Sequence, residues 1–364
     1  MNSMAIDRRT LLLGSIVALG GALTGTRQVA ALTGAAYAAA AQRSDGSHAI
    51  LLLSAAGAVV REIPLSGRGH DIAVHAASGR AVAFARRPGT FAVAFNIDDS
   101  RTPAVLEGAD GRHFYGHGVF SGDGRLLYTT ENDFTGERGV IGVYDVRADY
   151  RKIGEFSSFG LGPHDLLLLS DGRTLAVANG GIDTAPGSRA ELNLDGMQPS
   201  LAFVDCVRGE LIAKHTLAGD LHQLSIRHLA AAADGAVWFG GQWSGAVGET
   251  PELVGFASLK SGIQLVAPGA AAAGDGADLK GYIGAMAVSD DGAIIAASAP
   301  KAGKVLYIDA ARRRVRGVSK LDDVCGIAGE GGDRFLLSSG FGVFREEHAG
   351  KSVISETQLA DIAF

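Results

Sequence analysis

The sequence predicts an all-β protein, a seven-bladed β-propeller, and three observations lead to this prediction. A unit of about fifty residues recurs along the chain, which is the signature of a repeat architecture. Within each unit a Ser-Gly, Asp-Gly or Gly-Gly turn separates two short apolar runs, a pattern typical of β-hairpins. The chain of 364 residues also holds 52 glycines but only 9 prolines, which indicates many tight turns rather than disorder.

Each repeat consists of an apolar strand, the glycine turn, a second apolar strand, a loop and a third strand. The apolar runs are short and bounded by glycine, so they are expected to form strands rather than helices. A fourth strand follows most units, as at 211–217. The units span residues 71–98, 118–145, 165–205, 229–259, 285–309 and, more weakly, 326–344.

Six units make six sheets and leave apolar segments unused at both ends of the chain. These are residues 49–53 and 59–65 near the N-terminus and 359–364 at the C-terminus. Joining them gives a seventh blade, closed by both termini, and removes the sheet edge that a linear array would expose. A six-bladed ring with the ends merged differently is the alternative. In either case residues 41–364 are expected to form a single propeller domain.

The first 40 residues are predicted to be a twin-arginine signal peptide. Arg8 and Arg9 precede an apolar stretch at 14–23, and an alanine-rich run at 35–41 supplies a small-residue cleavage region. The apolar stretch is short for a bilayer, so no membrane span is expected after cleavage. The sequence therefore predicts a periplasmic protein that starts near Ala41. An ordinary secretory signal and a retained anchor are the alternatives.

Composition and charge argue against several classes of function. The formal net charge is −6, and no cluster of Lys and Arg forms the basic face that nucleic acid requires. The two cysteines, Cys206 and Cys325, are far apart and fit neither a disulfide framework nor a four-thiolate zinc site. No nucleophile elbow, zinc-protease motif or phosphate loop occurs in a supporting context. We expect a monomer that does not bind nucleic acid.

Four histidines stand at the same point of four consecutive units, directly before the first strand. Because the strands of a blade run alternately up and down, all the first strands start on one face of the disc, and the glycine turns lie on the other. The sequence therefore predicts that these histidines converge at one mouth of the central channel, with a cysteine at the matching place of the sixth unit. The residues are His70, His117, His164 and His228, followed by Cys325.

The ends of the second strands fall on the same face and are also polar. Loops that lead to this face contribute two more histidines. We therefore expect a ligand site beside the paired arginines Arg86 and Arg87, with contributions from His113, Glu131, Asn132, Asn179, His222, Gln242 and Trp243.

This inventory of side chains suits a transition metal. Imidazole nitrogens with a nearby thiol bind copper, zinc or iron well, and calcium or magnesium poorly, so Cu, Zn and Fe are the expected cofactors. The candidate ligands are His70, His117, His164, His228 and Cys325. A catalytic zinc typically needs about three protein ligands, and a ring spread over four blades need not converge that closely.

Structural roles for the same residues are the alternative. A histidine at a strand entry can simply hydrogen-bond to the neighbouring blade, and Trp243 can wedge between blades instead of stacking on a ligand. Adjacent residues of a strand point to opposite sides, so direct His–Asp pairs are not expected at His70–Asp71 or His164–Asp165.

Several further motifs of the chain match those of one family. They include the sequences RRPGTF at 86–91, GRHFYGHGVFS at 111–121, GPHDL at 162–166 and HQLSIRHL at 222–229. From about residue 48 onward the chain resembles the periplasmic domain-of-unknown-function family numbered 1513. The resemblance implies an exported propeller, similar to quinoprotein amine dehydrogenases or lactonases. It also implies that the family pattern continues shortly past Phe364 with an Asp-Asn-His segment.

The resemblance implies a role in a periplasmic iron-uptake system, without an established activity. We expect the histidine-lined mouth to bind a metal, a haem-related ligand or a partner protein, with iron-uptake proteins as the expected partners. A scaffold for protein partners, with structural histidines, is the second hypothesis. An enzyme of lactonase or oxidoreductase type ranks third, because a lactonase needs a carboxylate-rich calcium site and this mouth is rich in histidine.

Overall fold

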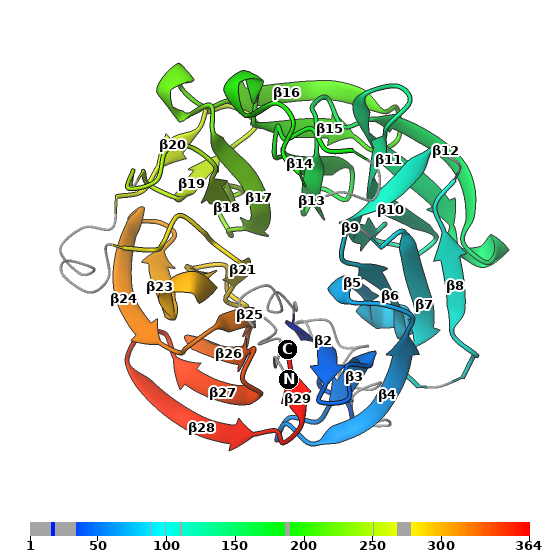
Figure 1. Cartoon of the computed structure of the whole chain (residues 1–364), viewed down its shortest axis with the longest axis vertical. Helices are drawn as coiled ribbons and strands as arrows, with labels where there is room; N and C mark the ends of the chain where they lie inside the picture. The colour runs from blue at the N-terminus through cyan, green and yellow to red at the C-terminus, as the bar shows by residue number, and fades with distance from the viewer. Residues whose placement is uncertain are drawn as a thin grey trace, which may run out of the picture.

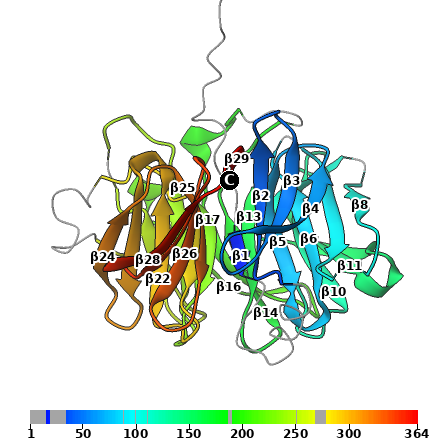
Figure 2. The ribbon, with the colours of Figure 1, turned by 90° about the horizontal axis from the view of Figure 1, so that it is seen from below.

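The computed structural model shows a ring of β-sheets around a central channel (Figure 1). It describes residues 16–18, 34–87, 89–98, 100–109, 111–185, 190–249, 251–267 and 278–364. Within these residues the strands form seven antiparallel sheets, arranged radially as the blades of a propeller. Seen from the side, the blades stand next to one another in a single disc (Figure 2). The predicted seven-bladed propeller is therefore confirmed.

Six of the blades contain four strands each, and the first strand of each blade lies nearest the channel (Figure 1). The first three of these blades consist of β5 (Gly69–His75), β6 (Arg80–Ala85), β7 (Phe91–Asn96) and β8 (Ala104–Glu107); β9 (Arg112–Phe120), β10 (Leu126–Asp133), β11 (Arg138–Asp145) and β12 (Arg151–Ser157); and β13 (Pro163–Leu168), β14 (Thr174–Asn179), β15 (Ser200–Asp205) and β16 (Glu210–Thr216).

The remaining three blades follow the same order from the channel to the rim. They consist of β17 (Leu224–Ala231), β18 (Val237–Trp243), β19 (Val254–Ala257) and β20 (Gln264–Leu265); β21 (Ala285–Val288), β22 (Ile294–Ala299), β23 (Lys304–Asp309) and β24 (Arg314–Lys320); and β25 (Val324–Gly329), β26 (Arg334–Ser339), β27 (Val343–His348) and β28 (Ser352–Gln358).

The helical segments that the structure describes are single 3-10 turns in the loops. They are η2 (Ala76–Ser78), η3 (Val146–Ala148), η4 (Leu194–Gly196), η5 (Gly219–Leu221) and η7 (Pro300–Ala302). Among the described residues, none of the helices has the length and apolar character needed to cross a membrane.

The first sheet in the chain closes the ring with strands from both ends. It contains β1 (Ile16–Ala18), β2 (Tyr37–Arg43), β3 (His48–Leu53) and β4 (Val59–Leu65), and β29 (Ile362–Ala363) also pairs with β2. In that pairing Ala363 stands opposite Gln42 and Ile362 opposite Arg43. The C-terminus lies beside β2 in Figure 1. The predicted closure by both termini is thus confirmed.

Strand β2 occupies residues that the alanine-rich pattern assigned to the end of the targeting segment. It pairs with β3 from Tyr37 opposite Leu53 to Gln42 opposite His48. Its side chains alternate between the two faces of the blade. Ala38 and Ala40 pack toward the second blade, whereas Tyr37, Ala39 and Ala41 pack toward the last. The domain boundary expected at residue 41 therefore falls inside β2. The targeting segment before residue 34, apart from β1, lies outside the described residues.

Alanine-rich second strands allow neighbouring blades to pack closely. In β6, Ala81, Ala83 and Ala85 are fully buried and belong to one cluster with Ile50 and Leu52 of the first blade. Each blade thus buries both of its faces against its neighbours, and the inner strands are held at a fixed distance from the channel axis. This packing positions the residues at the start of each inner strand.

Candidate functional site

The inner strands share an irregularity at the point where they enter the channel. In β5, β9, β13, β17 and β25 the register with the second strand shifts at this point, and one or more residues are left unpaired. A β-bulge of this kind bends the strand and re-aims the side chains beside it. The unpaired residues include His70, His164 and Arg227, and His228 follows directly after its bulge.

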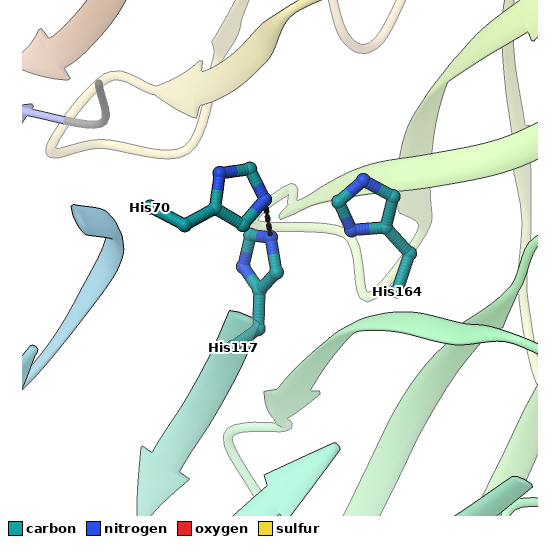
Figure 3. Close-up of side chains that lie close together, drawn as sticks. All are labelled: His70, His117 and His164. Atoms are coloured by element: carbon teal, nitrogen blue, oxygen red, sulfur yellow. Dashed lines mark hydrogen bonds between the residues drawn. The ribbon is translucent and has the colours of Figure 1, made fainter. Parts of the chain in front are cut away.

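The bulges bring four histidines of four blades into one buried cluster. None of the four side chains is more than 7% exposed. The ring centroids lie 4.7 Å apart for His70 and His117, 4.9 Å for His117 and His164, and 4.8 Å for His164 and His228. The Nε2 atoms of His70 and His117 are 3.1 Å apart (Figure 3). The sequence thus identified four side chains that the fold places together.

His117 is held between two carboxylates. Its Nδ1 lies 3.0 Å from Oδ2 of Asp71 and 3.3 Å from Oδ1 of Asp165. Asp165 is itself fixed, because it accepts hydrogen bonds from the backbone N–H groups of Leu166 and Leu229, at 2.7 and 2.8 Å. Burial alone would lower the pKa of His117, but the carboxylates of Asp165 and Asp71 raise it to about 10. Nδ1 therefore donates to the carboxylates, and Nε2 faces the other histidines.

The other three histidines are electrostatically different from His117. Burial lowers the pKa of His70, His164 and His228 well below the ordinary value, and nearby histidines and arginines lower it further. Among the described residues, Nδ1 of His70, Nδ1 of His164 and Nε2 of His228 are buried and have no hydrogen-bond partner. Buried polar atoms nearly always have a partner, so these ring nitrogens are suited to a ligand.

Three of the histidines fit the requirements of a metal centre. One ring nitrogen from each of His70, His117 and His164 lies within 4.8 Å of the others. Nitrogens on a tetrahedral zinc are about 3.3 Å apart, so these nitrogens would have to close by up to about 1.5 Å around an ion. The carboxylates of Asp71 and Asp165 contact Nδ1 of His117, and such a contact typically fixes the orientation of a metal-binding histidine ring.

A cavity of about 320 Å³ adjoins the cluster on the side of these carboxylates. Its polar lining consists of Asp71, His117, Asp165 and His228, and its remaining walls are largely apolar residues of the inner strands. The residues after the histidines in each strand line this cavity. The residues before the histidines therefore lie on the opposite side of the cluster, toward the predicted mouth.

Two predicted site residues serve the packing of the blades instead. The carboxylate of Glu131 accepts hydrogen bonds from Thr129, Tyr144 and Lys152, at 2.7–2.8 Å, so it is fully engaged inside its own blade. Cys325 lies in the apolar cluster between the last and first blades, where its thiol contacts the carbonyl oxygen of Phe364 at 3.3 Å. Its bulge directs the thiol into the blade interface, so the structure does not bring Cys325 into the histidine cluster.

Three further predicted residues lie near the histidines in sequence but outside their cluster. His113 is half-buried and packs edge-on against Phe134, with ring centroids 4.7 Å apart. Asn132 stands opposite His113 in the ladder and is buried. The amide of Asn179 donates to the backbone carbonyl of Ser158 at 2.9 Å. We find no bonds from these three side chains to the four histidines among those that the structure describes.

The remaining predicted residues lie on loops and strand ends. Nδ1 of His222 is 2.9 Å from the carbonyl oxygen of Gly219, within its own turn. Gln242 forms a β-bridge with Tyr282, and Trp243 packs partly against the core of its blade. These positions favour the structural interpretation of His222, Gln242 and Trp243.

Sequence reasoning missed the two carboxylates that hold His117. The His-Asp dipeptides at 70–71 and 164–165 were the available signal. Each aspartate turns away from its own neighbour, as the alternation of a strand requires, and meets the histidine of an adjacent blade instead. These contacts join neighbouring blades, so they depend on the angle between the blades, which the sequence of a single strand does not specify.

The chain matches the model of one protein family. The family described as "Protein of unknown function (DUF1513)" matches residues 63–364. The chain belongs to this family. No curated protein sequence matches it significantly. Among solved structures, the DUF1513 chain resembles one titled "Kuenenia stuttgartiensis Hydrazine Synthase", with a TM-score of 0.63 and 14% sequence identity, over 91% of this chain and 94% of that one. At this identity the likeness concerns the fold.

Proposed function

We propose that this DUF1513 protein is an exported propeller that binds a transition-metal ion at His70, His117 and His164, with His228 beside them. The observation that carries the proposal is the convergence of three buried ring nitrogens within 4.8 Å, from three separate blades. A copper, zinc or iron ion suits imidazole ligands. When bound, such an ion supplies a Lewis-acidic centre.

The alternative ligands are less well matched to the cluster. The four rings pack against one another, with centroids 4.7–6.2 Å apart, which leaves no space for a porphyrin between them. A bare ion is therefore favoured over a haem-related ligand. A calcium-dependent lactonase needs a set of oxygen ligands, whereas the cluster of candidate ligands found among the described residues consists of histidines.

We also propose that the protein acts in the periplasm, in an iron-linked system with iron-uptake partners. The paired arginines Arg8 and Arg9 before an apolar stretch support export. A cluster of imidazoles, which suits iron among other transition metals, supports the iron-linked system. Because residues 37–40 belong to β2, we place the cleavage site upstream of Tyr37. Replacing both arginines by lysine should retain the protein in the cytoplasm, as fractionation and immunoblotting would show. Undiminished periplasmic protein would contradict twin-arginine export.

Elemental analysis and titration calorimetry test the metal proposal. The protein should bind Cu, Zn or Fe tightly. The variant His117→Ala/His164→Ala should bind the metal more than about 100-fold more weakly, because removing only a residue that orients a metal ligand already costs up to that factor. The variant His75→Ala/His222→Ala, with two histidines outside the cluster, is the matched control and should bind normally. If the parent binds none of these metals, the histidines are structural and the scaffold hypothesis takes precedence.

A further inference from the structure

The mouth side of the histidine cluster carries a group of arginines. Arg227 is the bulge residue directly before His228, and Arg68 lies two residues before His70. Arg86 and Arg87 follow the end of β6, and the backbone N–H of Arg86 donates to the carbonyl of Arg68 at 2.7 Å. These four arginines come from two blades, and three of them act on the same cluster, because Arg68 and Arg86 lower the pKa of His70 and Arg227 lowers the pKa of His164 and His228.

Arg87 is held in a fixed orientation. The centre of its guanidinium lies 4.3 Å above the ring of Tyr115, and its Nη1 donates to Oγ1 of Thr184 at 2.7 Å. The Tyr115 ring is in turn 6.3 Å from the ring of His164. Within the described residues Thr184 is the one hydrogen-bond partner of this guanidinium, which leaves the remaining N–H donors of Arg87 available to a ligand.

Arg227 lies near Arg87 and Tyr115, and its buried positive charge is only partly compensated by nearby groups. Its Nε is buried and has no hydrogen-bond partner among the described residues. Burial lowers the pKa of Arg227, and the nearby Arg87 lowers it further, whereas Glu191 and the hydroxyls of Tyr115 and Tyr282 act in the opposite sense. Within the part of the chain that the structure describes, no ion pair joins Arg87 or Arg227 to a carboxylate.

The charges on the two sides of the cluster therefore differ in sign. Asp71 and Asp165 line the channel cavity, whereas Arg68 and Arg227 precede the histidines along their strands and so lie on the mouth side. A metal ion on three neutral or neutralised imidazoles would add positive charge beside the arginines, and a site with three protein ligands keeps a coordination position open. An anion that approaches from the mouth would meet this position and two guanidinium groups.

We propose that a small oxyanion, carboxylate or phosphate, binds between Arg87 and Arg227 on the mouth side of the histidine cluster, adjacent to the metal. Guanidinium groups recognise both anions through paired hydrogen bonds. The inference deepens the proposed metal-binding function and rests on it for the open coordination position. It assigns to Arg87 and Arg227 a role in binding the ligand.

The test uses the cobalt-loaded protein, titrated with acetate and with inorganic phosphate at constant ionic strength. Visible absorption of the bound Co²⁺ reports a new ligand, and the two anions distinguish carboxylate from phosphate. R87Q and R227Q should each bind the preferred anion at least about tenfold more weakly, while Co²⁺ affinity stays the same or improves. Arg227→Lys should fall between R227Q and the parent, because it keeps the charge but loses the paired donors.

Arg125→Gln is the matched control, because Arg125 is exposed on the face of the glycine turns. Melting curves verify that each variant is folded. Equal anion affinity in the parent and R227Q, or no binding of either anion by the parent, would overturn the inference. If Co²⁺ itself does not bind, the proposed function fails. Calorimetry of the metal-free protein then tests the inference by itself. Anion binding by the parent that R227Q loses would support the inference, and equal binding by both proteins, or no binding by the parent, would refute it.

Discussion

His117 connects the two halves of the site, because its ring nitrogens meet different partners. Nδ1 faces the carboxylates of Asp71 and Asp165, and Nε2 faces His70. In the metal-free protein the raised pKa makes this ring a buried imidazolium flanked by two carboxylates. The same carboxylates would increase the basicity of Nε2 toward a metal.

This arrangement predicts how the stability of the metal-free protein depends on pH. The pKa of His117 is about 10 in the folded state and 6.5 for the ordinary side chain. A raised folded-state pKa contributes stability that is complete below about pH 6.5 and is lost as the pH rises through about 10. We therefore expect the melting temperature of EDTA-treated protein to fall from pH 7 to 10 more steeply than that of His117→Gln. Parallel curves for the two proteins would refute the assignment.

For individual site residues, the sequence predicted the position in the fold better than the contacts of the side chain. The four histidines were identifiable because each directly precedes the apolar run that was predicted as an inner strand. Cys325 stands at the start of a first strand and Glu131 at the end of a second strand, on the same predicted face. Packing against Phe364 and the ion pair with Lys152 determine where their polar atoms lie. Such contacts depend on side-chain direction at a bulge, which the order of residues along a strand does not specify.

Among the elements, β2 differs most from expectation. An alanine-rich run resembles a signal-peptide cleavage region, and it also suits a strand that is buried between two blades. Ala38 and Ala39 are at most 1% exposed, and the hydroxyl of Tyr37 donates to Glu330 of the last blade. Composition alone does not separate these two interpretations, whereas the ladder of six residue pairs with β3 does.

The position of β2 predicts the consequence of processing at different points. A chain that begins at Ala35 loses the three-residue strand β1 but keeps β2 intact, so its melting temperature should stay close to that of the longest folded form. A chain that begins at Ala41 lacks the buried residues Tyr37–Ala40 and should be strongly destabilised. Intact mass measurement of the exported protein should therefore give a start before Tyr37. A mature protein that starts at Ala41 and melts at the same temperature would contradict this assignment.

For the whole molecule, the central feature is closure of the ring. The repeat and its glycine turns predicted seven blades, and the leftover apolar segments predicted that both ends share one sheet. The two N-terminal strands of that sheet, β1 and β2, were not predicted, because their residues lie in the segment that resembles a targeting signal.

Closure predicts that loss of the C-terminal segment affects the whole propeller. Residue Phe364 is only 3% exposed and packs with Tyr37 and Phe344. Deleting residues 359–364 removes β29 and this aromatic contact, so the melting temperature should drop by about 10 °C in a single transition. The exposed-site variant Val207→Ala serves as the control. Melting of the shortened protein at the parent temperature would contradict closure by both termini.

The fold places four histidines of four blades in one buried cluster, and metal binding there is the central claim. X-ray absorption spectroscopy of the zinc-loaded protein tests this claim most directly. We predict nitrogen neighbours at about 2.0–2.1 Å with the outer-shell scattering of at least three imidazoles, and their loss in the His117→Ala/His164→Ala variant. A zinc ion with only oxygen neighbours, or a spectrum that the variant leaves unchanged, would contradict the account.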